Sequence, residues 1–261
     1  MIKIKNKVIS TAAIILLLTF TPGLSGTEEI GINEGGEKMT FEVRWAFVVA
    51  GEVTLEFLPG EQLYSTRVNH YRYKARTSEF VDLFYKVRDT IESYTDADLN
   101  RSIIYRKKHR GKSTKNITVT FNWDRETAQH TINGNSMPPI EISPDTFDPL
   151  SVFYAFRSEL SDDNKEMKIN LTDGKRYITA VTKIVKKETI QVAGTKYNTI
   201  LVEPRMEGVG GVFQKTKNAR LRIWITDDTR RIPVRIKSKV SVGSFVADLV
   251  DYKGSYSVES N

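Results

Sequence analysis

The sequence contains no cysteine. This absence excludes a disulfide framework, and it excludes attachment through a lipid-modified N-terminal cysteine, because both need the thiol side chain. The 261 residues are 39% hydrophobic and 27% charged, which is an ordinary globular composition. A sizeable apolar core, in one large domain or two small ones, is therefore expected to hold the chain together.

Catalytic signatures are scarce. Only three histidines occur, His70, His109 and His130, and a Ser-His-Asp triad would need one of them to be aligned by a partner that the sequence does not identify. No G-x-S-x-G motif is present. The GKS tripeptide at 111–113 lacks the first glycine of a phosphate-binding loop, because Arg106 stands there. We therefore expect a protein that is not an enzyme and that uses neither cofactor nor metal.

Long hydrophobic runs are also missing. The apolar run from Val8 to Phe20 has about 13 residues, fewer than the ~20 that a membrane-spanning helix needs. It follows a lysine-rich start and precedes Pro22, an order typical of a cleaved secretory signal peptide. We expect the chain to divide into a signal peptide (1–25), a flexible leader (26–38), a single β-rich domain (39–254) and a C-terminal tail (255–261).

The excess of positive charge is small. Loss of Lys3, Lys5 and Lys7 with the signal peptide would lower the formal net charge from +7 to about +4, which does not favour a nucleic-acid binder. The mature protein is expected to be periplasmic and soluble, and not a lipoprotein.

Alternating apolar residues dominate the remainder. Phe41, Val43, Trp45, Phe47 and Val49 share one parity, and the pattern repeats at 53–57 after Ala50-Gly51. Further period-two segments follow, separated by turn signals such as Asn133-Gly134 and Asp173-Gly174. This rhythm predicts a mainly β protein, a large curved antiparallel sheet or half-barrel of ten or more strands.

One segment departs from this rhythm. In TFDPLSVFYAFRSEL, Asp148 can cap a helix that has Pro149 at its first position, and apolar residues then recur at three- and four-residue spacing. A weaker helical turn is expected at 78–84. The short amphipathic helix is either a lid over an apolar cavity or a plug that fills the core. As a cavity lining we expect an aromatic set of Trp45, Phe47, Phe57, Phe153, Tyr154 and Phe156.

The acidic pair Asp227-Asp228 lies in RIWITDDTRRIPVRI, between two alternating segments. Short carboxylates accept backbone N–H bonds and tolerate turn conformations, so the pair is interpreted as a hairpin connection and not as a metal site. Pro233 cannot donate a ladder hydrogen bond, which places it at a strand start or at an edge.

These residues also carry a family resemblance. The pattern W-x-x-D-D-x-x-R-x-P-V, together with DPLSVFYAFR and LFYKVRDTIESY, resembles the family called domain of unknown function 3108. The resemblance extends over most of Phe41 to Tyr252 and implies an exported Gram-negative envelope protein. It supplies no catalytic residues. The strand-rich pattern is also similar to the curled sheet of the periplasmic lipoprotein carriers.

Two surface features remain as candidate sites. The run YRKKHRGKSTK places Arg106, Lys107, Lys108, Arg110 and Lys112 around one hairpin tip, where they can attract an anionic surface such as phospholipid or lipopolysaccharide, unless they merely form a solvated turn. In RMEGVGGVFQK, a glycine-rich loop presents Phe213, which would either gate a cavity or pack against the core.

Two functions from different classes fit these observations. In the first, a non-enzymatic periplasmic protein binds or carries a lipid-like apolar ligand in its interior. In the second, an envelope assembly protein with a filled core and no small ligand binds a protein partner through its surface. An undetected hydrolase is disfavoured because no catalytic constellation emerges.

Overall fold

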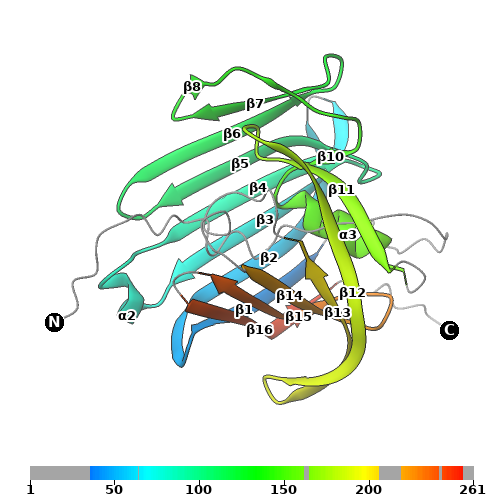
Figure 1. Cartoon of the computed structure of the whole chain (residues 1–261). Coiled ribbons are helices and arrows are strands. Elements are labelled where there is room, and N and C mark those ends of the chain that lie inside the picture. The colour runs from blue at the N-terminus through cyan, green and yellow to red at the C-terminus, as the bar shows by residue number, and fades with distance from the viewer. Residues whose placement is uncertain (1–35, 64, 162–164, 206–218, 241–242, 255–261) are drawn as a thin grey trace.

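The computed structural model describes residues 36–63, 65–161, 165–205, 219–240 and 243–254 of the chain (Figure 1). The first half of the sheet contains β1 (Glu37–Trp45), β2 (Val48–Leu63), β3 (Thr66–Thr77), β4 (Arg88–Asp96), β5 (Ser102–Arg110), β6 (Thr114–Asn122), β7 (Thr127–Ile132), β8 (Asn135–Ser136) and β9 (Ile140–Glu141). The second half contains β10 (Thr146–Phe147), β11 (Glu166–Thr172), β12 (Tyr177–Val192), β13 (Thr195–Pro204), β14 (Arg220–Thr226), β15 (Pro233–Val240) and β16 (Gly243–Lys253). Two helices, α2 (Glu79–Asp82) and α3 (Ser151–Glu159), complete the described elements.

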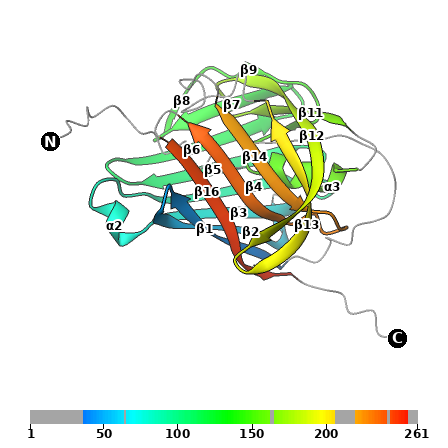
Figure 2. The same ribbon diagram turned by 60° about the horizontal axis from the view of Figure 1, so that its bottom comes forward.

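All sixteen strands belong to one sheet. Its order runs β10-β11-β12-β13-β14-β15-β16-β1-β2-β3-β4-β5-β6-β7-β8, with β9 paired to β7, and every pair except β10–β11 is antiparallel. Strand β1 therefore lies in the middle, between β2 and the last strand, β16. The sheet curls strongly, and its two arms face each other around α3 (Figures 1 and 2). The prediction of a curved, mainly antiparallel sheet with one short helix is confirmed.

Side-chain alternation decides which surface of the sheet is buried. Met39, Phe41 and Val43 of β1 face the core, as do Val53 and Leu55 of β2, and the intervening residues are more exposed. Tyr71, Tyr73, Ile91 and Tyr105 continue this apolar inner surface across β3, β4 and β5. At about 25 cal/mol per Å² of apolar surface removed from water, this continuous surface is the main source of stability.

Helix α3 is buried through most of its length. Phe153, Tyr154 and Phe156 pack in the main core, while Val152 and Ala155 pack against Phe147, Ile169 and Leu171 of β10 and β11. All residues from 151 to 157 are buried. The short amphipathic helix expected from the sequence is present. Because it lies between the two arms, its apolar side chains pack against both of them, while Ser158 and Glu159 at its end are less buried.

Asp148 anchors the start of α3. Its Oδ1 accepts the backbone N–H groups of Leu150 and Ser151 at 2.8 and 3.1 Å. The helix begins at Ser151, with Leu150 as its N-cap residue, two positions after the Pro149 that the sequence predicts as its first residue. Its Oδ2 accepts the hydroxyls of Ser93, Ser102 and Ser151 at 2.5, 2.7 and 2.8 Å. Because Ser93 and Ser102 belong to β4 and β5, this buried carboxylate ties the helix to the first arm of the sheet.

Arg157 anchors the other end of α3. Its guanidinium donates to both carboxylate oxygens of Glu37 at 2.6 and 2.7 Å, and to the backbone carbonyls of Arg230 and Arg231 at 3.0 Å each. The fork of five N–H donors suits this arrangement. The helix motif and the acidic hairpin, far apart in the sequence, are therefore joined by one side chain.

Candidate functional site on the outer face of β2 to β5

The predicted aromatic lining divides into two groups. Phe57, Phe153, Tyr154 and Phe156 meet in the core, where the ring of Tyr154 stacks on Tyr71 with 4.1 Å between centroids. Trp45 is 45% exposed and Phe47 is fully exposed, so neither of them lines the interior. Phe213 lies outside the described residues.

The prediction that Trp45 and Phe47 share the buried face of Phe41 and Val43 is therefore wrong. The hairpin between β1 and β2 turns at Ala46, whose φ is +54°, and the register shifts at Val43–Arg44. The alternation of the strand does not continue through such a turn. The indole of Trp45 stacks instead on Phe245 of β16, with 6.1 Å between ring centroids.

The predicted basic tip is also divided, because β5 extends to Arg110 and its side chains alternate. Arg106, Lys108 and Arg110 are exposed on the outer face, and Lys112 is exposed in the turn that follows. Lys107 points inward, with its Nζ 3.7 Å from Asp89 Oδ2, and is not available to an external anionic surface. The prediction that Lys107 contacts an anionic surface is therefore wrong.

The inward-pointing groups form a buried polar cluster. His109 Nδ1 lies 2.5 Å from Asp89 Oδ1, and the side chain of Asp89 is fully buried. Burial raises the pKa of the Asp89 carboxyl, although Lys107 and His109 act in the opposite direction. Burial likewise lowers the pKa of Lys107, against the attraction of Asp89. Asp89 is also one of the residues that line the groove described below.

Three rows of outward side chains cross β2, β3, β4 and β5, because paired residues of adjacent strands point to the same side. The row closest to α2 consists of Glu52, Arg76, Arg88 and Arg110. The second row consists of Thr54, Lys74, Thr90 and Lys108, and the third of Glu56, Arg72, Glu92 and Arg106. The third row is balanced in charge, so the positive charge is concentrated in the first two.

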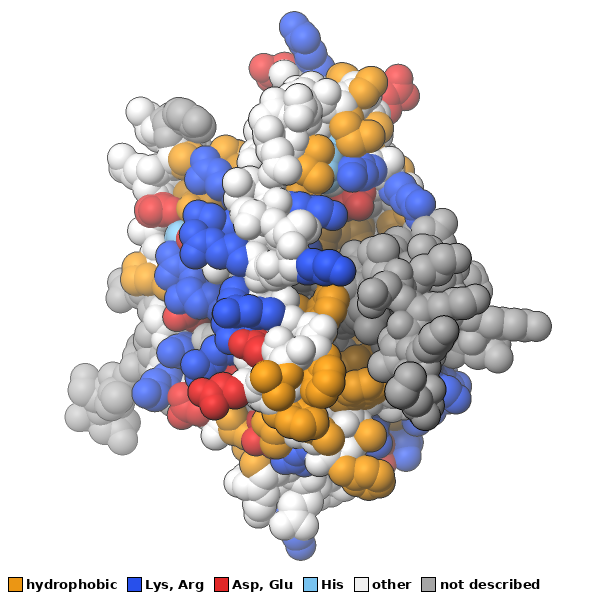
Figure 3. Space-filling view, turned by 90° about the vertical axis from the view of Figure 1, so that its left-hand side faces the viewer, with side chains coloured by type: hydrophobic (Ala, Val, Ile, Leu, Met, Phe, Trp, Pro, Cys, Tyr) orange, Lys and Arg blue, Asp and Glu red, His pale blue; other side chains and the backbone are white. Residues whose placement is uncertain are grey.

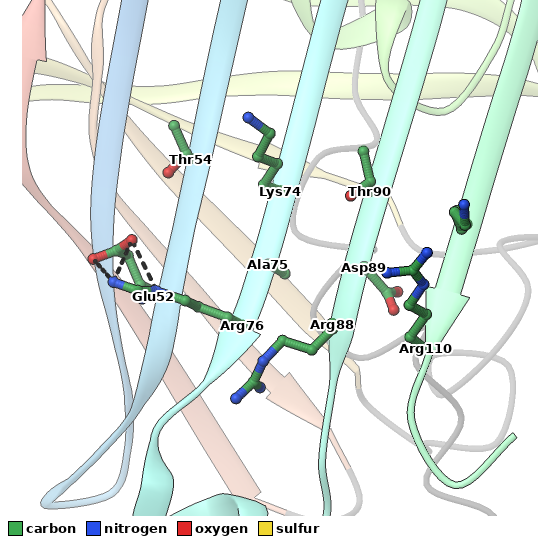
Figure 4. Close-up of a pocket in the computed structure, with 10 residues that line it drawn as sticks. Glu52, Thr54, Lys74, Ala75, Arg76, Arg88, Asp89, Thr90 and Arg110 are labelled. Atoms are coloured by element: carbon green, nitrogen blue, oxygen red, sulfur yellow. Dashed lines mark hydrogen bonds and ion pairs between the residues drawn. The ribbon is translucent and has the colours of Figure 1, made fainter. Parts of the chain in front are cut away.

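The first two rows line a groove of about 480 Å³ on this outer surface. Figure 4 shows Thr54, Lys74 and Thr90 side by side on neighbouring strands, with Arg76 and Arg110 closer to the strand ends. We refer to Lys74, Arg76, Arg88, Lys108 and Arg110 as the basic face. Its arrangement can bind extended anionic surfaces or groups, since the cations are spread over four strands and do not converge on one point.

Some of these cations have carboxylate partners. Arg76 bonds Glu52 at 3.2 Å, Arg88 bonds Asp82 of α2 at 2.5 Å, and Lys74 lies 3.4 Å from Glu56. Hydrogen bonds from Arg88 are the main cause that holds the pKa of Asp82 below its ordinary value. Lys108 and Arg110 make no ion pair with any residue that the structure describes, so their charge is directed to solvent.

The two other histidines, His70 and His130, contact neighbouring groups of the protein. His70 stacks on Tyr94 with 4.4 Å between ring centroids and lies 3.0 Å from Glu61, and burial lowers its pKa despite the nearby carboxylates. His130 Nδ1 lies 3.0 Å from the carbonyl of Asp173, and burial also lowers its pKa. Within the described ranges, no group of three or more metal-ligating side chains is present.

The acidic pair occupies the connection between β14 and β15, as the sequence predicts. Asp228 accepts bonds from Thr226 Oγ1 at 2.7 Å and from the guanidinium of Arg230 at 2.6 and 2.9 Å. Burial opposes its ionisation, but these bonds more than offset it, so its pKa lies below the ordinary value. Asp227 pairs with Lys187 at 3.0 Å and with Arg231 at 3.3 Å.

Replacing both carboxylates, by Asp227→Asn with Asp228→Asn, is expected to cost no more than about 1–2 kcal/mol, because each amide keeps one acceptor oxygen for the turn. Chemical denaturation measures the effect, and Asp251→Asn at an exposed position of β16 supplies the baseline. A folded double variant that had lost a bound metal or a measurable activity would refute the turn interpretation.

Sequence reasoning missed two parts of this surface. Arg76 and Arg88 lie outside the basic run, and they join it only through the register of β3, β4 and β5. The segment at 80–84 places Phe80, Leu83 and Phe84 in solvent, with exposed fractions of 58%, 77% and 77%. Apolar residues in LFYKVRDTIESY were available as a signal, but their exposure depends on the tertiary fold.

Comparison with known proteins yields a family and a fold. The sequence profile described as "Protein of unknown function (DUF3108)" matches residues 40–250. The chain is similar in structure to the Brucella abortus protein titled "Crystal Structure of Beta-barrel-like Protein of Domain of Unknown Function DUF1849", with a TM-score of 0.55 and 10% identity over 84% of this chain and 97% of that chain. At that identity the likeness concerns the fold alone. No curated protein matches the sequence.

Proposed function

Because the chain belongs to the DUF3108 family, which its profile match over residues 40–250 establishes, and because that membership brings no catalytic residues with it, we propose a function from the geometry. The protein is a non-enzymatic component of the cell envelope that binds through its outer surface. Its interior is filled by its own side chains and holds no small ligand.

The observation that carries this proposal is the burial of α3. A carrier with this fold would hold its ligand between the two arms of the sheet, and the helix occupies that position. Phe153 and Phe156 are 1% and 0% exposed, and the rings of Phe57, Tyr71 and Tyr154 stack beside them. In an interior packed in this way, an acyl chain could bind only by displacing the protein's own aromatic side chains.

The polar groups support a binding role over catalysis. Asp148 and its three serine partners are fully buried and mutually hydrogen-bonded, and they hold the helix in place. The Asp89–His109 pair is buried as well. The surface, in contrast, carries the concentrated charge of the basic face. Among the described residues no helix is long and apolar enough to cross a membrane. Export to the periplasm remains part of the proposal, on the basis of the lysine-rich start and the short apolar run.

Uptake of a fluorescent fatty acid by the mature protein, in the absence of vesicles, tests the filled interior. We expect no saturable uptake, and native mass spectrometry of protein purified from its own envelope should show only the mass of the chain. A carrier of known stoichiometry serves as the positive control. Stoichiometric uptake, or a lipid that purifies with the protein and is released on unfolding, would refute the proposal and favour the carrier hypothesis.

A further inference from the structure

A group of exposed apolar side chains lies at one end of the curled sheet. Ser78 joins its two parts, because its N–H donates to Ala50 O at 2.9 Å and its hydroxyl donates to Val49 O at 2.8 Å. These bonds place α2 beside the turn between β1 and β2. We call this surface the apolar rim, and it comprises Trp45, Phe47, Val48, Val49, Phe80, Leu83 and Phe84.

The apolar rim adjoins the basic face. Gly51 pairs with Thr77 and Arg76 with Arg88, so the first cationic row is one step along the strands from α2. Figure 3 shows this end of the molecule, with hydrophobic side chains gathered next to a band of Lys and Arg. Single exposed apolar residues are ordinary, but a contiguous group of this size indicates an interaction site.

The rim projects and is not hollowed. Phe47 is 101% exposed at a hairpin tip, and Leu83 and Phe84 are each 77% exposed beyond the end of β3. Protruding apolar side chains of this kind can enter the interfacial region of a membrane without a preformed pocket. Tryptophan and phenylalanine are the residues that interfacial membrane binders place at the level of the lipid headgroups.

The charged groups next to the rim indicate the charge of the surface that the rim would contact. Glu52 and Asp82 are paired with Arg76 and Arg88, which leaves Glu79 as the exposed carboxylate of α2. Four exposed cations at this end make no ion pair with any described residue, namely Lys86, Lys108, Arg110 and Lys112. An anionic surface is complementary to this excess.

A second copy of the chain fits the rim less well. Two-fold pairing of identical surfaces would place one rim against the other. Such pairing would cover the apolar side chains but would supply no opposite charge for the unpaired cations of either basic face.

From this juxtaposition we propose that the apolar rim and the basic face together dock the protein on the anionic phospholipid leaflet of a membrane. The aromatic side chains of the rim enter the headgroup region, and the cations bind lipid phosphates beside it. This inference rests on the proposed function, since it names the surface that the outer face binds.

Co-sedimentation with vesicles tests the docking. Wild-type protein is expected to bind vesicles that contain phosphatidylglycerol and to bind pure phosphatidylcholine weakly. In a basic variant, Lys108→Gln with Arg110→Gln and Lys112→Gln, affinity should fall on the order of 100-fold, because each cation near an anionic leaflet contributes about fivefold. In an apolar variant, Phe47→Ser with Phe80→Ser and Phe84→Ser, it should fall by about tenfold or more.

Control variants remove exposed apolar or cationic side chains elsewhere on the surface. Met137→Ser with Val185→Ser removes apolar residues that are 41% and 48% exposed, and Lys168→Gln with Lys175→Gln and Lys196→Gln removes three exposed cations from the other arm of the sheet. Both controls should bind within about threefold of wild type if the effect is local to the rim and the basic face. Thermal unfolding of each variant verifies that it is folded.

Brominated lipids supply an independent readout. Trp45 is the exposed indole of the rim, so its fluorescence should be quenched when the protein binds vesicles brominated near the headgroup, and a Trp45→Phe variant should lose that quenching. Absence of binding to anionic vesicles, equal binding by wild type and the rim and basic variants, or binding only to lipopolysaccharide would overturn the docking. Absence of both vesicle binding and fatty-acid uptake would overturn the docking alone, whereas uptake together with vesicle binding would overturn only the filled interior.

Discussion

Phe153→Ala will lower the free energy of unfolding by about 3–5 kcal/mol, the range for deleting a buried phenyl group from close-packed surroundings. The ring of Phe153 is 1% exposed and meets Tyr154 edge to face, with 5.3 Å between centroids, on the inner side of the sheet. Because both arms of the sheet pack against α3, the surroundings cannot collapse readily into the space that the ring leaves. Urea denaturation, read by circular dichroism, measures the loss.

The control for this change is Phe80→Ala. Phe80 lies on the apolar rim with 58% of its surface exposed, so the same substitution should cost no more than about 0.5 kcal/mol. If Phe153→Ala cost less than about 1 kcal/mol and opened a site that takes up the fluorescent fatty acid, the interior would be a ligand cavity instead of a filled core.

Arg157→Met, as a separate variant, will lower the free energy of unfolding by a similar amount, about 3–5 kcal/mol. The substitution leaves the carboxylate of Glu37 without its cation in a largely buried position. The Arg157 side chain is 7% exposed and that of Glu37 is 15% exposed. The carbonyls of Arg230 and Arg231 lose their donors in the same substitution.

A double variant separates the cost of the unpaired Glu37 carboxylate from the cost of the other bonds that Arg157 makes. Arg157→Met with Glu37→Met removes the stranded charge, and we expect it to recover part of the loss, since replacing both members of a buried pair is far less costly than removing one. Arg44→Met should change stability by no more than about 1 kcal/mol, because its guanidinium pairs with Glu42 on the surface, and Asp248, 3.6 Å away, keeps its bond from Arg235. A single Arg157 variant as stable as wild type would show that the pair does not hold the helix.

The strands could be predicted from the sequence because alternation is a local property. Thus Met39, Phe41 and Val43 are buried in turn, and the turn at Asp227–Arg231 lies where short acidic side chains indicated it. The prediction was wrong where a turn reset the alternation, at Trp45 and Phe47. The packing of α3 against both arms of the sheet was not predictable from the residues of the helix alone. Neither circumstance is visible in a window of ten residues.

The candidate site could be predicted less completely from the sequence than the strands could. Lys108 and Arg110 belong to one run, but Arg76 and Arg88 reach them through strand register, which depends on pairings between distant segments. The same register sends Lys107 inward to Asp89. Periodicity assigns each residue to a face of its own strand, and only the assembled sheet determines which faces become continuous.

The position of β1 in the middle of the sheet has a kinetic consequence. Its ladder to β16 joins Lys38 to Lys253 and Trp45 to Phe245, so the central hydrogen bonds close a loop that contains nearly the whole domain. Closing such a loop costs conformational entropy before any contact compensates for it. Topologies dominated by contacts between residues far apart in the sequence therefore fold slowly. A chain that emerges N-terminus first therefore keeps one edge of β1 unpaired until its last strand has appeared. The two arms can form as separate meanders in the meantime, and the final zipping of β16 onto β1 converts them into one curled sheet.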